Sequence, residues 1–314
     1  MSDIELKTYK QEYMNEIISG WDTSLFYDTI THERFTQEVL LDENFDPGLA
    51  LVAVSGGHVV GFSLGIKRKY PYLTRGLEEG RGWISSFFII PEYRRKGIGQ
   101  KLLQKEEVLL KARGVKEITL CAYSPNYFTP GVDFKYPGGI PFFDVNGYVR
   151  GTDAVSMQRD LFTYTIPENT KKHLYELANK GTTFHMFTKQ YMEKLLAFVD
   201  KEFGAGWVRN ILIALRKGEA EDTILIATDK QDNIIGYCMR KIDGNDARFG
   251  PIGVDESLRS EGIGGVLIDI QMEEMKKRSI YYMYFLWTHG DAMRFYERHG
   301  LKVYRTYQLY RKKI

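Results

Sequence analysis

Apolar residues along this chain follow two kinds of pattern, short continuous runs and longer stretches with helical spacing. Residues 49–54 and 59–66 are apolar runs on either side of a Ser-Gly-Gly turn, and residues 224–228 and 234–239 form a second pair. Short apolar runs bounded by turn residues are typical of paired strands. The pattern therefore predicts one antiparallel strand pair in each half of the chain.

A stretch with helical spacing follows each strand pair. In the first half, its apolar positions are Ile98, Leu102, Leu103, Val108 and Leu109. In the second half, they are Ile263, Leu267, Ile270, Met272 and Met275. Each set forms one apolar face, which predicts amphipathic helices that end near residues 113 and 278.

Four segments recur in the same order in both halves, which indicates an internal duplication. The matched pairs are residues 60–62 with 235–237, 91–99 with 255–264, 118–120 with 283–285, and 142–147 with 295–300. The extra residues of the first half fall near 70–80 and 127–136, where loops are expected. We therefore predict two domains of one fold, residues 1–163 and 168–314.

Mixed strands and helices in this order predict the fold class. Each half is expected to be an α/β sandwich, with a mixed, mostly antiparallel sheet that helices flank on both faces. A length of 314 residues fits two such domains in tandem, at about 100–200 residues each. Helical segments near residues 171–179, 189–203 and 207–217 are expected before the second strand pair.

Composition excludes several classes of partner. The net charge is +2 and the basic residues are scattered, so no nucleic acid is expected to bind. No apolar run approaches a membrane span and the N-terminus is polar, which favours a cytoplasmic protein without a membrane partner. Cys121 and Cys238 lie in apolar strands, as buried free thiols do, and the six histidines show no metal-ligand spacing. No metal is expected.

The repeated loop carries the candidate chemistry. Its pattern, Arg-x-x-Gly-x-Gly, occurs once before each motif helix. Glycines let the backbone approach a phosphate, and the free amides of a helix N-terminus converge on an anion. The pattern matches neither of the common dinucleotide or P-loop fingerprints. The predicted binding residues are Arg94, Arg95, Lys96, Gly97, Ile98 and Gly99 in the first loop and Arg259, Ser260, Gly262, Ile263 and Gly264 in the second.

With its flanking elements, this loop resembles motif A of the GCN5-related N-acetyltransferases (GNAT). The resemblance rests on a strand ending in Ile-Pro-Glu-Tyr or Val-Asp-Glu-Ser, then Arg-x-x-Gly-Ile-Gly, then an amphipathic helix. Residues 295–301 are similar to the family's C-terminal motif, and residues 249–254 and 285–288 extend the match to tandem members. The resemblance covers nearly the whole chain.

The resemblance implies acetyl transfer from acetyl-CoA to a primary amine of a small molecule, by direct attack and without a metal. The loops would hold the CoA pyrophosphate. Backbone groups of the preceding strand, around Ile89 and Ile90 or Ile252 and Val254, would pair with pantetheine. The amine must lose a proton before it attacks, and a water relay is expected to take it, since neither strand carries a glutamate base.

The two halves differ at the position of the family's catalytic acid. Tyr296 occupies it in the second half, whereas Phe143 occupies it in the first and has no proton to donate. This difference predicts Tyr296 as the catalytic residue. The first loop is the more basic, so CoA binding is expected to be stronger there even if the chemistry belongs to the second half. His289 is expected to cap the last helix, or simply to be exposed, rather than to relay a proton.

Three questions stay open at this stage. The aromatic insertion at residues 127–136 either walls the acceptor site of the first half, with Asp133 reading the substrate, or packs between the domains. The protein is either an N-acetyltransferase, a non-catalytic acetyl-CoA sensor, or an acyltransferase with another donor or a peptide acceptor. The protein is expected to be a monomer or a homodimer. Neither the acceptor nor the oligomeric state has a local sequence signature.

Overall fold

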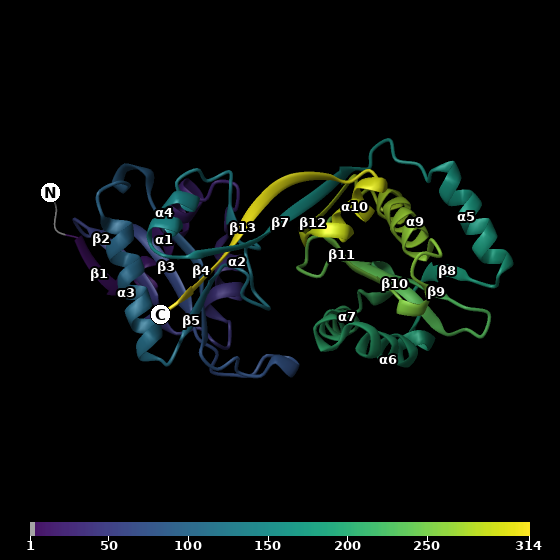
Figure 1. The fold of residues 1–314 in the computed structure, drawn as a ribbon, viewed down its shortest axis with the longest axis horizontal. Coiled ribbons are helices and arrows are strands. Elements are labelled where there is room, and N and C mark those ends of the chain that lie inside the picture. Colours follow the sequence, from purple (N-terminus) through teal and green to yellow (C-terminus); the bar gives the residue numbers. More distant parts are fainter. Residues whose placement is uncertain (1–3) are drawn as a thin grey trace. The chain divides into compact units, whose positions relative to one another are not determined.

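The computed structural model describes residues 4–314, and the chain divides into two compact units (Figure 1). The first unit runs through Ala154 and also includes Arg305–Ile314, while the second comprises Val155–Tyr304. Each unit is a mixed α/β sandwich with a mostly antiparallel sheet, so the predicted fold class is confirmed.

The sheet of the first unit follows the order β1-β2-β3-β4-β5-β13-β7, with β6 paired to β13. Its strands are β1 (Ile4–Thr8), β2 (Ala50–Ser55), β3 (His58–Ile66), β4 (Arg81–Ile89), β5 (Glu117–Leu120), β6 (Val132–Asp133), β7 (Val149–Asp160) and β13 (Lys302–Lys313). The β4–β5 pair is parallel, and the other pairs with a described register are antiparallel.

Helices cover both faces of this sheet. They are α1 (Met14–Ser24), α2 (His32–Phe35), α3 (Ile98–Ala112) and α4 (Gly139–Val145), with short turns η1 (Gln11–Tyr13), η2 (Thr36–Leu40), η3 (Pro47–Leu49), η4 (Leu73–Arg75) and η5 (Pro91–Tyr93). Successive side chains of β2 point to opposite faces of the sheet. Val52 packs in the core with α1 and α2, whereas Leu51 packs with α3. This alternation buries β2 completely.

The second unit repeats the arrangement with its own sheet, in the order β11-β10-β9-β8. The strands are β8 (Thr183–Met186), β9 (Ile224–Thr228), β10 (Ile234–Arg240), β11 (Phe249–Val254) and β12 (Tyr282–Thr288). The helices are α5 (Glu168–Asn179), α6 (Met192–Phe203), α7 (Ala205–Lys217), α8 (Ala220–Thr223), α9 (Ile263–Lys277) and α10 (Gly290–Arg298), with turns η6 (Lys189–Tyr191) and η7 (Glu256–Leu258). In this unit, β12 pairs with the Val155–Asp160 part of β7.

The described units differ from the contiguous domains 1–163 and 168–314 that the sequence predicts. The division falls at Ala154, and the last ten residues return to the first unit, where Arg311 of β13 pairs with Thr119 of β5. A strand's alternating pattern specifies which face it buries but not which neighbour it pairs with. For this reason, the return of the chain's end could not be predicted from local patterns.

The motif helices match the prediction, with one correction. Helix α3 buries Ile98, Leu102, Leu103, Glu106 and Leu110. Val108, predicted on the apolar face, is 60% exposed. The buried face of α3 therefore includes the carboxyl group of Glu106 and excludes Val108. Glu106 faces β3 at Gly65, where a β-carbon would lie 2.1 Å from its Oε1 atom, so glycine leaves the room that the carboxyl group occupies.

We expect the Glu106→Gln variant to change how stability depends on pH. Burial raises the pKa of Glu106 to about 8, and the Ser63 hydroxyl offsets only part of the shift. Because the pKa of Glu106 is higher in the folded than in the unfolded chain, its contribution to stability is fully present only below the unfolded pKa of about 4.3. The contribution then falls by about 1.4 kcal/mol per pH unit up to about pH 8.

The measurement is the urea midpoint from about pH 4 to about pH 9. Glu106→Gln should match the wild type near the low end of this range and exceed it at the high end. Glu43→Gln, at an exposed position, should follow the wild type throughout. Parallel pH profiles for Glu106→Gln and the wild type would show that Glu106 is ionised in the folded protein.

Candidate active site

The two repeated loops have the same backbone conformation. Arg95 and Gly97 have φ values of +61° and +78°, and Ser260 and Gly262 have values of +75° and +86°. Lys101 N–H makes the first hydrogen bond of α3, to Gly97 O at 3.1 Å, so the preceding amides of the helix have no partner within it. Each loop thus leads into a long helix whose first amides are free to bind an anion.

The side chains of the first loop divide into two roles. Arg94, predicted to contact phosphate, donates from Nε to Ile89 O at 2.8 Å and from Nη2 to Ser24 O at 3.4 Å. It therefore braces the loop against the end of β4. Arg95 and Lys96 are exposed, so they carry the positive charge that the loop presents to solvent.

Next to this loop, β4 and β5 part. They pair in parallel from Arg81 with Glu117 to Ile84 with Leu120, and their described pairing stops there. Cys121 N–H still donates to Ile84 O at 2.8 Å, but Cys121 and Ala122 have φ values of +55° and +50°, which turn the chain away. The β5-facing edge of β4 beyond Ile84 is thus left unpaired by β5.

A cavity of about 840 Å³ fills this opening, within the size range of small-molecule sites. It extends from Arg95, Gly97 and Gly99 of the loop, past β4, to Asp28 and Asp133. The predicted binding residues Ile89, Arg94, Arg95, Gly97 and Gly99 line it, whereas Ile90, Lys96 and Ile98 do not. The structure thus brings the first loop, the strand and the insertion to one site.

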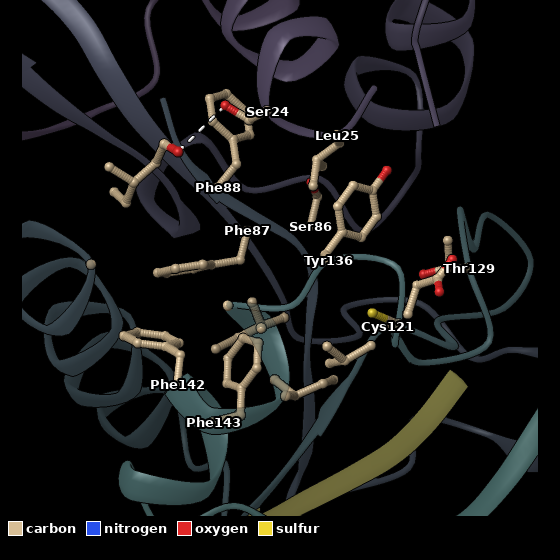
Figure 2. A pocket seen from close by; sticks show the side chains of 18 of the residues that line it. Ser24, Leu25, Ser86, Phe87, Phe88, Cys121, Thr129, Tyr136, Phe142 and Phe143 are labelled. Carbon is tan, nitrogen blue, oxygen red and sulfur yellow. Dashed lines mark hydrogen bonds between the residues drawn. The ribbon is translucent and has the colours of Figure 1, made fainter. Parts of the chain in front are cut away.

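Aromatic rings form much of the cavity wall. Phe87 of β4 stacks on Phe142 of α4 with ring centres 5.5 Å apart, and Phe143 meets Phe87 edge-on at 5.9 Å (Figure 2). On another wall, Phe128 of the insertion packs edge-on against Trp21 at 5.0 Å. Phe143 occupies the position predicted for the missing acid and lies in the core with α3.

The far end of the cavity is polar, and its lining includes two carboxylates, Asp28 and Asp133, and one ammonium group, Lys135. Arg305 of β13 donates from Nη1 and Nη2 to the two oxygens of Asp28, at 2.5 and 2.6 Å, and from Nε to Asp133. The Tyr136 hydroxyl donates to Asp28 at 2.9 Å, and burial together with this carboxylate raises the pKa of Tyr136. Asp133 lies at this wall, as one of the two interpretations of the insertion expects. Asp28 and Arg305 were not identified from the sequence, because no local pattern marks them.

Two adjacent serines of β4 line the cavity, and their hydroxyl oxygens are themselves buried. Ser85 and Ser86 of β4 are 3% and 6% exposed, and within the described part of the chain neither Oγ atom has a hydrogen-bond partner. Both residues line the cavity, and Ser86 lies beside Leu25 and Tyr136 (Figure 2). Buried hydroxyl groups normally have partners, so these two favour a polar ligand.

In the second unit, the His173 ring lies beside the glycine that precedes α9, while Arg259, Ser260 and Glu261 of the loop are exposed. A β-carbon on Gly262 would lie 3.2 Å from the His173 ring, whereas one on Gly97 would have no described atom within 4 Å. Lys180 also pairs with Glu261 at 3.6 Å. The predicted residues Arg259, Ser260, Ile263 and Gly264 lie in this loop or start α9, and Ile252 and Val254 lie in β11.

Tyr296 lies half-buried on α10, between aromatic rings. Its ring centre is 4.4 Å from that of Phe285 and 5.1 Å from that of Phe295. Burial raises the pKa of Tyr296 to about 12, so its hydroxyl is protonated at neutral pH. His289 is the residue before α10. It is exposed and its side chain makes no capping hydrogen bond, so of the two expected roles the structure shows plain exposure and not capping.

Within residues 4–314, no helix is long and apolar enough to cross a membrane. Clusters of His, Cys, Asp and Glu with the arrangement of a metal site were not found in the same range.

Family models match both units of the chain. A model described as the acetyltransferase (GNAT) family matches residues 12–129, and one described as the acetyltransferase (GNAT) domain matches residues 220–303. Among curated proteins, an acetyltransferase of Sodalis glossinidius is 28% identical over 39% of this chain and 78% of its own length. The spermidine N(1)-acetyltransferase of Thermoplasma acidophilum is 26% identical over 45% of this chain and 77% of its own length.

Solved structures share the fold over nearly the whole chain. The glucosamine N-acetyltransferase region of a fungal multi-domain β-N-acetylglucosaminidase matches 99% of this chain, with a TM-score of 0.79 and 18% identity, over 38% of the fungal chain. A GCN5-related N-acetyltransferase from Sphaerobacter thermophilus matches 99% of this chain and 95% of its own, with a TM-score of 0.71 and 17% identity. A tandem GNAT protein of clavulanic acid biosynthesis matches 99% and 98%, with a TM-score of 0.63 and 14% identity.

We expect the Cys121 thiol at the cavity wall to react slowly with electrophiles. Burial raises its pKa to about 11, which makes thiolate scarce at neutral pH. At pH 8, alkylation by iodoacetamide should be about 100-fold slower than that of a thiol with pKa near 8.5, and the rate should rise with pH up to about 11. Mass spectrometry of the Cys121 peptide measures this rate. Alkylation at pH 8 as fast as that of free cysteine would show an activated thiol and contradict the expectation.

Proposed function

Because this chain is a tandem member of the GNAT acetyltransferase family, we propose that its first unit transfers an acetyl group from acetyl-CoA to a primary amine of a small molecule. Both family domains are those of acyl-CoA N-acyltransferases, and the chain is such an enzyme. The observation that carries the assignment to the first unit is its single cavity, which joins the open glycine loop, the unpaired edge of β4 and an acidic end.

Acetyl-CoA supplies the activated acyl group. In the proposed site, the amides that begin α3 and the charges of Arg95 and Lys96 bind the pyrophosphate, while Arg94 keeps the loop in place. The edge of β4 from Ser85 to Phe88 offers backbone groups to pantetheine, in the manner of an added strand. The Ile89 carbonyl, predicted for this role, already accepts from Arg94 and Ser24. The hydroxyl groups of Ser85 and Ser86 are positioned to hydrogen-bond the ligand's amide or carbonyl groups.

The amine is proposed to enter from the acidic end. Asp28 and Asp133 attract its charged form, and a water relay then removes the proton before attack. Neither carboxylate is assigned as the base, since both accept hydrogen bonds from Arg305. The leaving thiolate needs little help from an acid, because a thiol titrates near pH 8.5. This explains how Phe143 is tolerated at the acid position.

Charge reversal in the loops tests where acetyl-CoA binds. Lys96 and Glu261 occupy equivalent positions in the repeat, so Lys96→Glu gives the first loop the charge of the second. We expect the wild type to bind one acetyl-CoA per chain by calorimetry, and Lys96→Glu to weaken binding at least about tenfold, the effect of roughly 1.4 kcal/mol.

Glu261→Lys is the matched control and should leave the affinity unchanged. Two equivalent sites per chain, or a loss of affinity only on changing the second loop, would contradict the assignment to the first unit. No binding at millimolar acetyl-CoA would overturn the proposed function. Tight binding without turnover of any amine would instead identify an acetyl-CoA sensor.

Substitution of Tyr296 tests which unit performs the chemistry. The sequence predicts Tyr296, in the second unit, as the catalytic acid, whereas the site that we propose lies in the first unit. Since His173 covers Gly262 in that unit, we expect Tyr296→Phe to keep at least half of the wild-type turnover of amines in a thiol-release assay. Loss of turnover with acetyl-CoA binding retained would move the chemistry to the second unit.

A further inference from the structure

Glu106 is a buried acid on the helix that follows the first glycine loop. It lies on the face of α3 that packs on the sheet, and it is fully buried. Neither of its carboxyl oxygens has a hydrogen-bond partner within the described part of the chain. Buried polar groups normally have partners, so packing alone does not explain an acid at this position.

The groups around Glu106 do not compensate a negative charge. Ser63 of β3 and Arg113 favour the ionised carboxyl group, but Arg113 already pairs with Asp46 at 3.0 Å, and Asp46 opposes ionisation. Tyr148, which also faces Glu106, is itself kept neutral because burial raises its pKa. The strand β2 packs on α3 without an ionisable side chain. Burial is therefore the largest influence, and it raises the pKa of Glu106 to about 8.

The second unit has an amide at the equivalent position. When the two glycine loops are aligned, Glu106 corresponds to Gln271 of α9, and in the matched strands Ser63 corresponds to Cys238 of β10. Gln271 is also fully buried, and its Oε1 atom lies 3.7 Å from the Cys238 thiol. A glutamine of nearly the same shape thus fills this place in one unit. The glutamate of the other unit adds the capacity to ionise.

Helix α3 connects Glu106 to the proposed CoA site. Gly99 and Gln100 at its start line the cavity, and Ile98 shares a core with Ile89 at the end of β4. Beyond Gly99 the helix contains neither glycine nor proline, so it has no residue that favours a kink. Glu106 lies about 12 Å along the helix from Ile98, at 1.5 Å per residue. A displacement of α3 at Glu106 is therefore passed to the amides at its start.

We propose that the protonated carboxyl group of Glu106 holds α3 on β3 in the arrangement that binds acetyl-CoA, and that loss of its proton releases acetyl-CoA from the first unit. A carboxylate without a partner in a dry core costs several kcal/mol, and movement of α3 away from β3 lowers this cost by admitting water. The same movement displaces the amides that bind the pyrophosphate. The inference rests on the proposed transferase function of the first unit.

The proposal has a thermodynamic consequence. Ionised Glu106 predominates above about pH 8, so the affinity for acetyl-CoA falls as the pH rises through this value. Ionisation and binding then oppose each other, and the opposition is reciprocal. Binding of acetyl-CoA above about pH 8 must therefore take up a proton.

Calorimetric titration of the full chain with acetyl-CoA at pH 7 and pH 9 tests the inference. We expect the Kd of the wild type to be about tenfold higher at pH 9, where about 90% of a group with a pKa near 8 is ionised. At pH 9, binding should take up about 0.9 proton, measured in two buffers with different heats of ionisation. The phosphate groups of the ligand do not contribute, because their second pKa is about 6.

Glu106→Gln gives the first unit the residue that the second unit has. Its Kd should agree within twofold between pH 7 and pH 9, and binding should take up no proton. Gln271→Glu is the matched control, because it puts the same acid at the equivalent place of the unit outside the proposed site. It should show the pH dependence of the wild type.

Three results would overturn the inference: a wild-type Kd that is equal at the two pH values, a pH dependence that Glu106→Gln retains, or one that Gln271→Glu abolishes. Global unfolding of the wild type at pH 9, seen by circular dichroism, would also overturn it, because the proposed release occurs from a folded unit. Proton uptake by the wild type decides the question even if Glu106→Gln does not fold. If the wild type does not bind acetyl-CoA at pH 7, the proposed function fails first, and the two failures are thereby distinguished.

Discussion

The parting of β4 from β5 beyond Ile84 is the constraint on which the candidate site depends. The last hydrogen bond of the pair is Cys121 N–H to Ile84 O, after which Cys121 and Ala122 turn away in a left-handed conformation. Such a conformation costs about 1–3 kcal/mol for a residue other than glycine. The bond from Ala122 N–H to Thr129 O, at 3.1 Å, offsets part of that cost and ties the turn to the insertion. The turn both opens the cavity and anchors its far wall.

The second unit shows that the backbone of this site and its accessibility are separate properties. Its loop repeats the φ values of the first, and β11 likewise has little pairing with β12, through a single bridge from Arg248 to Tyr284. The difference lies in side chains. His173 lies over Gly262, and the Phe203 ring occupies the space beside Gly253, where a β-carbon would be 2.3 Å away. The two loops thus share one backbone conformation, but in the second unit the side chains of His173 and Phe203 lie close to the loop and to β11.

The sequence predicts features that depend on local pattern. The strand pairs, both motif helices and the glycine loops follow from periodicity and repetition. The sequence left two places open for the insertion, at the acceptor site or between the domains, and in the structure it lines the cavity. Arg305 could not be identified in this way, because it is one of several basic residues in an alternating strand and its partner Asp28 lies at the other end of the chain. Val108 was misplaced because helical spacing alone does not show that Glu106 is the buried residue.

The two ends of the cavity differ in how far apart in the sequence their residues lie. The end proposed for CoA is built from consecutive elements, β4, the loop and α3, so a short pattern describes it and a family model recognises it. The acidic end is assembled from three segments that are far apart in sequence, and Arg305 joins two of them. The family model that matches this unit ends at residue 129, before Asp133 and Arg305. Membership of the family therefore identifies the reaction but not the amine.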